Sequence, residues 1–161
     1  MNEETRPMKT VAESRTEQVQ ILLPEHINGY DRLFGGQLMQ WIDVVAAVVA
    51  RRHSHCNVTT ASIDNLQFKA AAHVNDTIVL FGQITYVGHT SMEVRVQTYV
   101  ESMDGMRRLI NRAYLVMVAL DENEKPTEVP GILPETMEEK LEYEAGQKRN
   151  ARRKQRRAEQ F

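Results

Sequence analysis

Residues 28–50 read NGYDRLFGGQLMQWIDVVAAVVA, a polar turn and a Gly-Gly pair followed by a run that is apolar almost all the way round. Apolar residues recur there at intervals of three and four, which predicts a helix whose apolar body covers residues 37–50, with the core stripe Leu38, Ile42, Val45 and Val49. The Gly-Gly pair marks its N-terminus, and the basic residues at 51–53 suit its C-terminal end. Met39 and several alanines occupy the other side. Because a helix without a polar face is normally buried on every side, we expect a sheet against one face and a second subunit against the other.

Asp43 is the only ionisable residue between residues 37 and 50. An unpaired carboxylate in apolar surroundings costs free energy or changes its pKa, so its presence requires a partner or a function. One interpretation is chemical: the carboxylate serves as a general base toward water, or as a nucleophile. The other is structural: Asp43 makes a satisfied polar contact across a dimer interface and helps to fix the pairing. The residues alone leave both interpretations open.

Outside the helix the sequence follows a period of two, which is typical of strands. Residues 58–68 alternate in this way, and the later segments end at turn signals such as Gly88-His89. The predicted strands cover residues 18–23, 58–68, 77–87, 91–101 and 109–120. One short strand, one buried helix and four long strands joined by tight turns describe an α+β fold, with an antiparallel sheet wrapped around a central buried helix.

The composition limits the classes of protein to be considered. A length of 161 residues suits one domain with a real core, and a formal net charge of −2 argues against a nucleic-acid surface over the whole domain. Cys56 is the only cysteine, so no disulfide forms within the chain and a reducing compartment fits best. Neither a signal peptide nor an apolar run of the roughly 18 residues that span a bilayer is present. We expect a cytoplasmic protein.

The sequence divides into a flexible leader over residues 1–16, a folded domain over residues 17–130 and a charged extension over residues 131–161. In the extension, an acidic segment at 135–144 predicts a short exposed helix. Residues 148–157, KRNARRKQRR, hold seven lysines or arginines and no acid. The simpler interpretation of this run is a solvated, partly disordered tail. The alternative is an electrostatic contact with nucleic acid, ribosomes or the phosphates of a substrate, although the run contains no aromatic residue for base stacking.

His53, His55 and Cys56 invite a metal-site hypothesis. Two helical histidines at this spacing point to different faces, and no second pair of ligands follows to complete four. We therefore predict a helix exit followed by a strand, and no metal site. Sequence signatures of a serine-hydrolase elbow, a phosphate loop and a dinucleotide fold are absent as well.

Asn28, Gly36 and Asp43 remain as candidates for chemistry. An amide side chain and an N–H group at a helix N-terminus can jointly hold a carbonyl oxygen as it becomes an oxyanion. Asp43 lies about two turns further on, roughly 10 Å along the helix axis, too far to act on a carbonyl held at the start of its own helix. Two antiparallel helices related by a two-fold axis would bring Asp43 of one chain near Gly36 of the other.

Four segments together resemble the hotdog-fold acyl-CoA thioesterases of the acyl-CoA hydrolase type. They are NGYDRLFGGQLMQWID, VTTASIDNLQF, VNDTIVLFGQITYVGHTSMEV and LVMVALDENEKPTEVP, in order and with family-like spacing between about residues 18 and 130. The resemblance implies hydrolysis of acyl-CoA to a free acid and coenzyme A, without a metal or a separate cofactor. It also implies homodimers whose two sheets join, often assembled further into trimers of dimers.

By position, the resemblance assigns roles to individual residues. It makes Asp43 the catalytic acidic residue, supplied by the opposing subunit, and it matches Asn28 and Gly36 to the groups that polarise the thioester carbonyl. Thr60 falls in the segment that can position the attacking water. The turn that lines the coenzyme A channel corresponds to Gly88, His89, Thr90 and Ser91.

The chain departs from the family pattern at three places. Asp31 stands where a glycine is usual, His89 stands where an arginine is common, and AAAHVND at residues 70–76 replaces a frequent proline and glycine. These departures concern coenzyme A binding more than the catalytic groups.

Two other functions are compatible with this fold. A non-catalytic acyl-CoA sensor, with the basic tail touching nucleic acid, is the main alternative. The short leader, which leaves no room for a helix-turn-helix, and the presence of both Asn28 and Asp43 argue against it. A dehydratase would need a histidine in the body of the helix, and none lies there.

Overall fold

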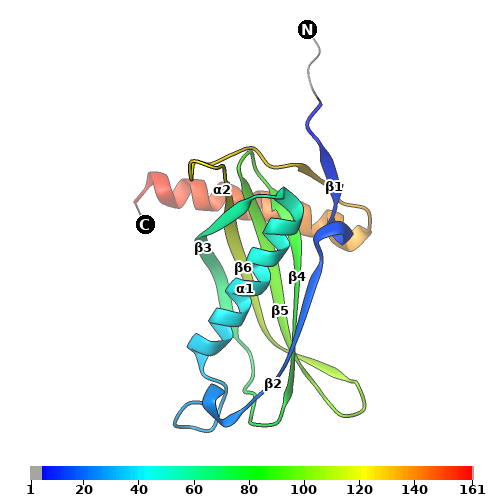
Figure 1. Cartoon of the computed structure of the whole chain (residues 1–161), viewed down its shortest axis with the longest axis vertical. Coiled ribbons are helices and arrows are strands. Elements are labelled where there is room, and N and C mark those ends of the chain that lie inside the picture. Colours follow the sequence, from blue (N-terminus) through cyan, green and yellow to red (C-terminus); the bar gives the residue numbers. More distant parts are fainter. Residues whose placement is uncertain (1–4, 161) are drawn as a thin grey trace.

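The computed structural model describes residues 5–160. Its main sheet is antiparallel, with five strands in the order β2-β4-β5-β6-β3. The strands are β2 (Thr16–Ile21), β3 (Asn57–Phe68), β4 (Thr77–Val87), β5 (Ser91–Glu101) and β6 (Arg107–Leu120). The sheet curls around the helix α1 (Gly35–Ser54), which crosses one of its faces (Figure 1). The predicted α+β architecture, a sheet wrapped around a central helix, is confirmed.

The core lies between α1 and the sheet. The side chains of the predicted stripe are all buried: Leu38, Ile42, Val45 and Val49. The sheet supplies alternate residues of β4, β5 and β6 to the same core. Because apolar area removed from water contributes about 25 cal/mol per Å², this helix–sheet contact is the main source of stability for the domain.

The outer side of α1 is open in the single chain. Met39 is 37% exposed and Val44 is 49% exposed, and Asp43 is half-buried between them. The sheet covers one face of the helix as expected, and the other face, where we expect a second subunit, is open in the single chain. The exposed apolar stripe is the surface that a second subunit would need to cover.

The N-terminal segment differs from the predicted leader. Within it, β1 (Met8–Thr10) pairs in parallel with β7 (Gly131–Leu133), and a single 3-10 turn, η1 (Val11–Ser14), leads into β2. A second such turn, η2 (Pro24–His26), follows β2. The pairing joins residues more than a hundred positions apart, so no local period in the sequence signals it. Residues 1–4 of the predicted leader lie outside the described residues.

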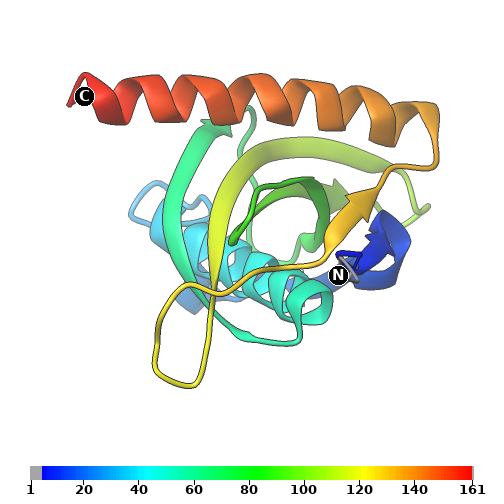
Figure 2. The ribbon, with the colours of Figure 1, turned by 90° about the horizontal axis from the view of Figure 1, so that it is seen from above.

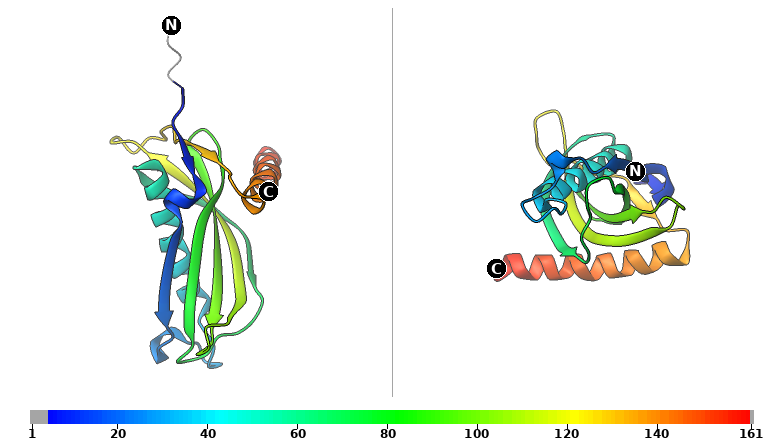
Figure 3. Two further views of the ribbon diagram at one scale, coloured as in Figure 1. Left: turned by 90° about the vertical axis from the view of Figure 1, so that its right-hand side faces the viewer. Right: turned by 90° about the horizontal axis from the view of Figure 1, so that it is seen from below.

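The C-terminal extension differs as well, because one helix, α2 (Met137–Ala158), includes both the acidic segment and the basic run. It lies across the face of the sheet opposite to α1 (Figures 2 and 3). Its charge order suits a helix, with Glu138 and Glu139 in the first turn and Arg156 and Arg157 in the last, each opposite in sign to the helix dipole there. Within residues 5–160, no helix is long and apolar enough to cross a membrane.

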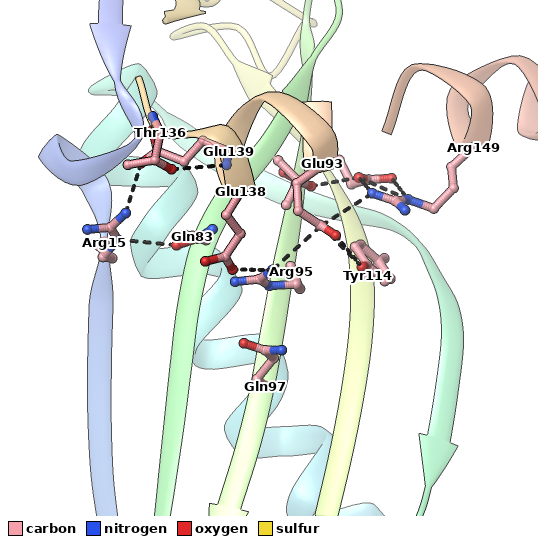
Figure 4. A network of polar contacts seen from close by, with 12 residues as sticks. Arg15, Gln83, Glu93, Arg95, Gln97, Tyr114, Thr136, Glu138, Glu139 and Arg149 are labelled. Atoms are coloured by element: carbon pink, nitrogen blue, oxygen red, sulfur yellow. Dashed lines mark hydrogen bonds and ion pairs between the residues drawn. The ribbon is translucent and has the colours of Figure 1, made fainter. Parts of the chain in front are cut away.

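A network of buried charges holds α2 on the sheet (Figure 4). The carboxylate of Glu93, on β5, is 2% exposed and accepts hydrogen bonds from Arg149 at 2.8 Å and from Arg153 at 2.9 Å. The helix comes close enough that a Cβ added at Gly146 would lie 2.7 Å from the Cβ of Tyr86. The basic run is therefore held in place by a tertiary contact and is not a loose tail.

Candidate active site

Asp43 and Thr60 form the one direct contact among the predicted catalytic residues. The hydroxyl of Thr60, on β3, donates a hydrogen bond of 2.6 Å to Oδ1 of Asp43, on α1. Within residues 5–160, the second carboxylate oxygen, Oδ2, has no hydrogen-bond partner. The carboxylate is thus oriented through one oxygen and retains the other to accept a proton.

Asn28 lies in the tight turn that leads into α1. Its Oδ1 accepts the backbone N–H of Tyr30 at 2.9 Å, and its own N–H donates to the carbonyl of Arg32 at 2.8 Å. Asp31, where the family pattern has glycine, takes a φ of 57°, a left-handed conformation that aspartate tolerates better than most residues. Of the side-chain amide of Asn28, only the oxygen, Oδ1, takes part in the hydrogen bonds of the turn. In the described chain its Nδ2 has no acceptor, so both of its N–H donors are available.

Gly36 is in the first turn of α1, as predicted. The first helical hydrogen bond runs from Leu38 to the carbonyl of Phe34, so the N–H of Gly36 precedes the helical bonding pattern. Among the described residues no backbone carbonyl accepts it. An N–H in this position, at the positive end of the helix dipole, suits a partial negative charge.

Within one chain the four groups lie in two places. Gly36 is in the first turn of α1 and Asn28 in the turn before it, whereas Asp43 is in the body of α1 and Thr60 is on β3. Among the described residues, no hydrogen bond joins Asn28 or Gly36 to Asp43 or Thr60. Because Gly36 and Asp43 are both on α1 and seven residues apart, about 10 Å separates them along the helix axis.

The edge of the sheet next to Asp43 is open. β3 is the last strand of the sheet and pairs with β6 on one side only. Most of its side chains are exposed or half-exposed, including Phe68 near its end. An unpaired edge beside an exposed apolar helix stripe is a surface on which a second chain can dock by strand pairing and apolar burial together.

The turn between β4 and β5 borders a cavity of about 780 Å³. The predicted coenzyme A residues, Gly88, His89, Thr90 and Ser91, all line it. The opposite walls come from β3, including Ala61 next to Thr60, and from the second half of α2. The structure therefore brings the four predicted residues together on one cavity that extends to the neighbour of Thr60.

Several basic residues of this cavity were not among the predicted site residues. Arg6 donates to the carbonyls of Gly88 at 2.6 Å and Val129 at 2.7 Å, and so holds the turn in place. The basic α2 side chains at the cavity are Arg153, Lys154, Arg156 and Arg157. The basic run was visible in the sequence, but its position against the turn depends on how α2 packs.

The histidines considered as metal ligands have other contacts. The buried ring of His53 places Nε2 2.7 Å from the carbonyl oxygen of Pro130, and His55 has its Nε2 2.9 Å from the amine of Lys9. Burial lowers the pKa of His53, against an opposing effect of the Pro130 carbonyl. Over residues 5–160, no group of three or more His, Cys, Asp or Glu side chains is arranged to hold a metal ion.

Comparison with known proteins agrees with this geometry. Residues 30–106 match the Thioesterase superfamily. The uncharacterized acyl-CoA thioester hydrolase YkhA of Bacillus subtilis is 38% identical over 159 residues, which cover 98% of this chain and 92% of the relative.

The solved structures that superpose on this chain include an acyl-CoA hydrolase and an acyl-CoA thioesterase. The acyl-CoA hydrolase of Staphylococcus aureus, in complex with butyryl coenzyme A, coenzyme A and coenzyme A disulfide, superposes with a TM-score of 0.91 at 37% identity, covering 96% of this chain and 94% of that one. A hexameric acyl-CoA thioesterase superposes with a TM-score of 0.90 at 41% identity, covering 94% of this chain and 98% of the other. By its sequence and its fold, the chain belongs to the hotdog-fold acyl-CoA thioester hydrolase family of the Thioesterase superfamily.

Proposed function

We propose that this protein hydrolyses acyl-CoA to a free carboxylic acid and coenzyme A, at active sites shared between two subunits. Each site combines Asn28 and Gly36 of one subunit with Asp43 and Thr60 of the partner. The observation that carries the proposal is the Asp43–Thr60 pair, a carboxylate oriented by one hydrogen bond on the outer side of α1, where no other side chain between residues 37 and 50 is ionisable. Coenzyme A is part of the substrate and is not a separate cofactor.

The chemistry follows from the free donors and acceptors of the site. The N–H of Gly36 and Nδ2 of Asn28 donate to the thioester oxygen and stabilise the oxyanion. Oδ2 of Asp43 takes a proton from water, the water oxygen bonds to the carbonyl carbon, and the carbon–sulfur bond then breaks. The leaving thiolate of coenzyme A receives the proton. In the alternative path, the carboxylate itself attacks and water hydrolyses the resulting anhydride.

A site shared between two subunits brings Asp43 close enough to act on a carbonyl held at Gly36. A carbonyl held at Gly36 is about 10 Å along the axis from Asp43 of the same helix. A two-fold axis beside α1, with the two β3 edges paired, sets the helices antiparallel and brings Asp43 of one chain toward Gly36 of the other. The same arrangement covers Met39 and Val44, which are exposed in the single chain.

The relatives support these assignments. The Staphylococcus aureus hydrolase binds butyryl coenzyme A, and its solved variants replace an aspartate, an asparagine and a threonine at its positions 43, 28 and 60 by alanine. This chain carries the same residue types as Asp43, Asn28 and Thr60. The hexameric thioesterase supports a trimer of dimers. The single free cysteine fits a cytoplasmic location.

The first experiment measures free-thiol release from acyl-CoAs that range from short to long and from straight to branched. The parent should release thiol, whereas Asp43→Asn should retain its fold and its affinity for coenzyme A and lose about 10²–10⁴-fold in kcat. An Asp43→Asn variant that turns over at the parental rate would refute the role of Asp43. Tight binding without hydrolysis by either protein would identify a sensor instead.

A second experiment tests whether the site is shared. Asp43→Asn and Asn28→Ala subunits are each inactive alone, but a mixed dimer contains one site in which both residues are intact. After subunit exchange we expect about a quarter of the parental activity, since half of the dimers are mixed and each has one working site. Sites contained within single chains would regain none. Trapping of an acyl-enzyme then distinguishes the two paths, because only the anhydride path bonds the acyl group to Asp43, and label from water found in Asp43 after a single turnover would show the same path.

A further inference from the structure

The cavity beside the Gly88–Ser91 turn is strongly basic. Five arginine or lysine side chains line it, namely Arg6, Arg153, Lys154, Arg156 and Arg157, against the single carboxylate of Asp64. Four of the five come from α2. A wall with this charge selects an anionic ligand, and it faces the turn that the proposed function assigns to coenzyme A.

Three of the five cations are already engaged. Arg153 forms ion pairs with Glu93 at 2.9 Å and with Asp64 at 3.2 Å, and Arg156 pairs with Asp64 at 3.0 Å. Arg6 is committed to the backbone carbonyls of Gly88 and Val129. Within the described part of the chain, Lys154 and Arg157 have neither an ion pair nor a side-chain hydrogen bond. These two charges are available to a ligand.

The residues of α2 that remain free or shape the cavity lie on one side of the helix and form one wall of the cavity. Asn150, Arg153, Lys154 and Arg157 are spaced by three, four and seven, so they lie on one face of the helix, and all four line the cavity. The buried pairs of Arg149 and Arg153 with Glu93 hold that face toward the turn. Lys154 and Arg157 are therefore presented from a fixed helix, which reduces the entropy that a bound anion must overcome.

The turn itself carries no permanent cation. Its one basic side chain, His89, is 75% exposed, with Nδ1 3.8 Å from Glu128. The nucleotide part of coenzyme A carries a 3′-phosphate and a diphosphate, and both need charge compensation.

We propose that Lys154 and Arg157 of α2 bind the phosphates of the coenzyme A nucleotide and supply the permanent charge that the turn lacks. The inference rests on the proposed function, because it places the nucleotide of that substrate in this cavity. Arg153 and Arg156 help to shape the wall through Asp64 and Glu93, while Lys154 and Arg157 contact the ligand.

The test compares two double variants that remove the same charges from the same helix. Lys154→Gln with Arg157→Gln removes the cavity pair, and Lys148→Gln with Arg152→Gln removes an exposed pair outside this cavity. Hydrolysis is measured with acyl-CoA, acyl-dephospho-CoA and acyl-pantetheine of one chain length. For the cavity variant we expect the KM for acyl-CoA to rise about tenfold, with kcat unchanged, and the KM for acyl-pantetheine to stay at the parental value. The control should keep all parental constants.

Dephospho-CoA identifies which phosphate is bound. If the variant and the parent have the same KM for acyl-dephospho-CoA, the two cations contact the 3′-phosphate, and if the tenfold difference persists they contact the diphosphate. The salt dependence of KM should also be weaker in the cavity variant than in the parent.

Three results would overturn the inference: an unchanged KM for acyl-CoA, an equal rise in the control variant, or an equal rise for acyl-pantetheine. Calorimetric binding of free coenzyme A to both variants gives an answer independent of turnover. A parent that hydrolyses nothing refutes the proposed function, yet a tenfold loss of coenzyme A affinity confined to the cavity variant would still uphold the phosphate site. Equal affinity in both variants would refute it.

Discussion

The hydroxyl of Thr60 donates a 2.6 Å hydrogen bond to Oδ1 of Asp43, and this contact joins the open edge strand β3 to the exposed stripe of α1. A lone carboxylate on that stripe would rotate among several orientations. The bond from Thr60 restricts it and leaves Oδ2 without a hydrogen-bond partner among the described residues. The two surfaces that a dimer would cover thus meet at the proposed catalytic carboxylate.

Removing the hydroxyl of Thr60 should therefore lower turnover. For Thr60→Val, which keeps the shape of the side chain, we expect kcat to fall about 10- to 100-fold, since a hydrogen bond to a charged group contributes about 1.5–3 kcal/mol. The KM for acyl-CoA should change little. Thr60→Ser retains the hydroxyl and should stay near the parental rate. Steady-state kinetics of the three proteins provide the measurement, and equal rates for Val and Ser would mean that the bond has no part in catalysis.

The buried carboxylate of Glu93 should dominate the anchoring of α2. Glu93→Gln removes the buried carboxylate that Arg149 and Arg153 share and leaves them only the longer pairs with Glu142 and Asp64, so we expect the free energy of unfolding to fall by about 3 kcal/mol or more. Glu138→Gln is the control, because that carboxylate is 73% exposed and its 3.4 Å pair with Arg95 should contribute under about 1 kcal/mol. Urea unfolding measures both. Similar losses in the two variants would contradict the special role of Glu93.

Gly146 should resist a substitution that normally stabilises helices. Alanine gains about 1 kcal/mol over glycine in a helix interior, but a Cβ here would lie 2.7 Å from the Cβ of Tyr86 and 3.0 Å from Oε1 of Glu93. Because overpacking costs about 1–3 kcal/mol, Gly146→Ala should lower the melting temperature. The neighbouring, exposed Gln147→Ala should alter stability by under about 0.5 kcal/mol. A higher melting temperature for Gly146→Ala would show that α2 is not closely packed there.

Because His53 is buried, we expect the free energy of unfolding to decrease in acid. Burial lowers its pKa below the ordinary value of 6.5, and its Nδ1 has no partner among the described residues. As the pH falls through 6.5 the unfolded chain binds a proton that the folded chain does not, so this contribution to stability is present above that pH and is lost below it, down to the lowered pKa.

The pH effect is measurable by comparison with His53→Gln, which does not titrate and can still donate to the Pro130 carbonyl. Between about pH 7 and 5, the unfolding free energy of the parent should fall more steeply than that of the variant, by at most about 1.4 kcal/mol per pH unit. Parallel slopes would show that His53 titrates normally in the folded protein.

Much of the fold was accessible from local periodicity. The alternation in β4 and β5 predicted their bounds, 77–87 and 91–101, and the three-and-four spacing predicted the body of α1. The ends of α1 agree with the sequence signals as well, because the helix starts at Gly35 of the Gly-Gly pair and ends at Ser54, one residue beyond the basic 51–53 segment.

What the sequence by itself determined is the alternating and helical pattern of the domain and the identity of its chemical groups, since side-chain period and residue type are local properties. Only the tertiary structure decided that β1 pairs with β7, that Thr60 orients Asp43, and that the basic run forms a helix wall beside Gly88–Ser91. Each of these depends on contacts between distant segments. A buried carboxylate such as Glu93 can fix a helix that, by composition alone, would be a solvated tail.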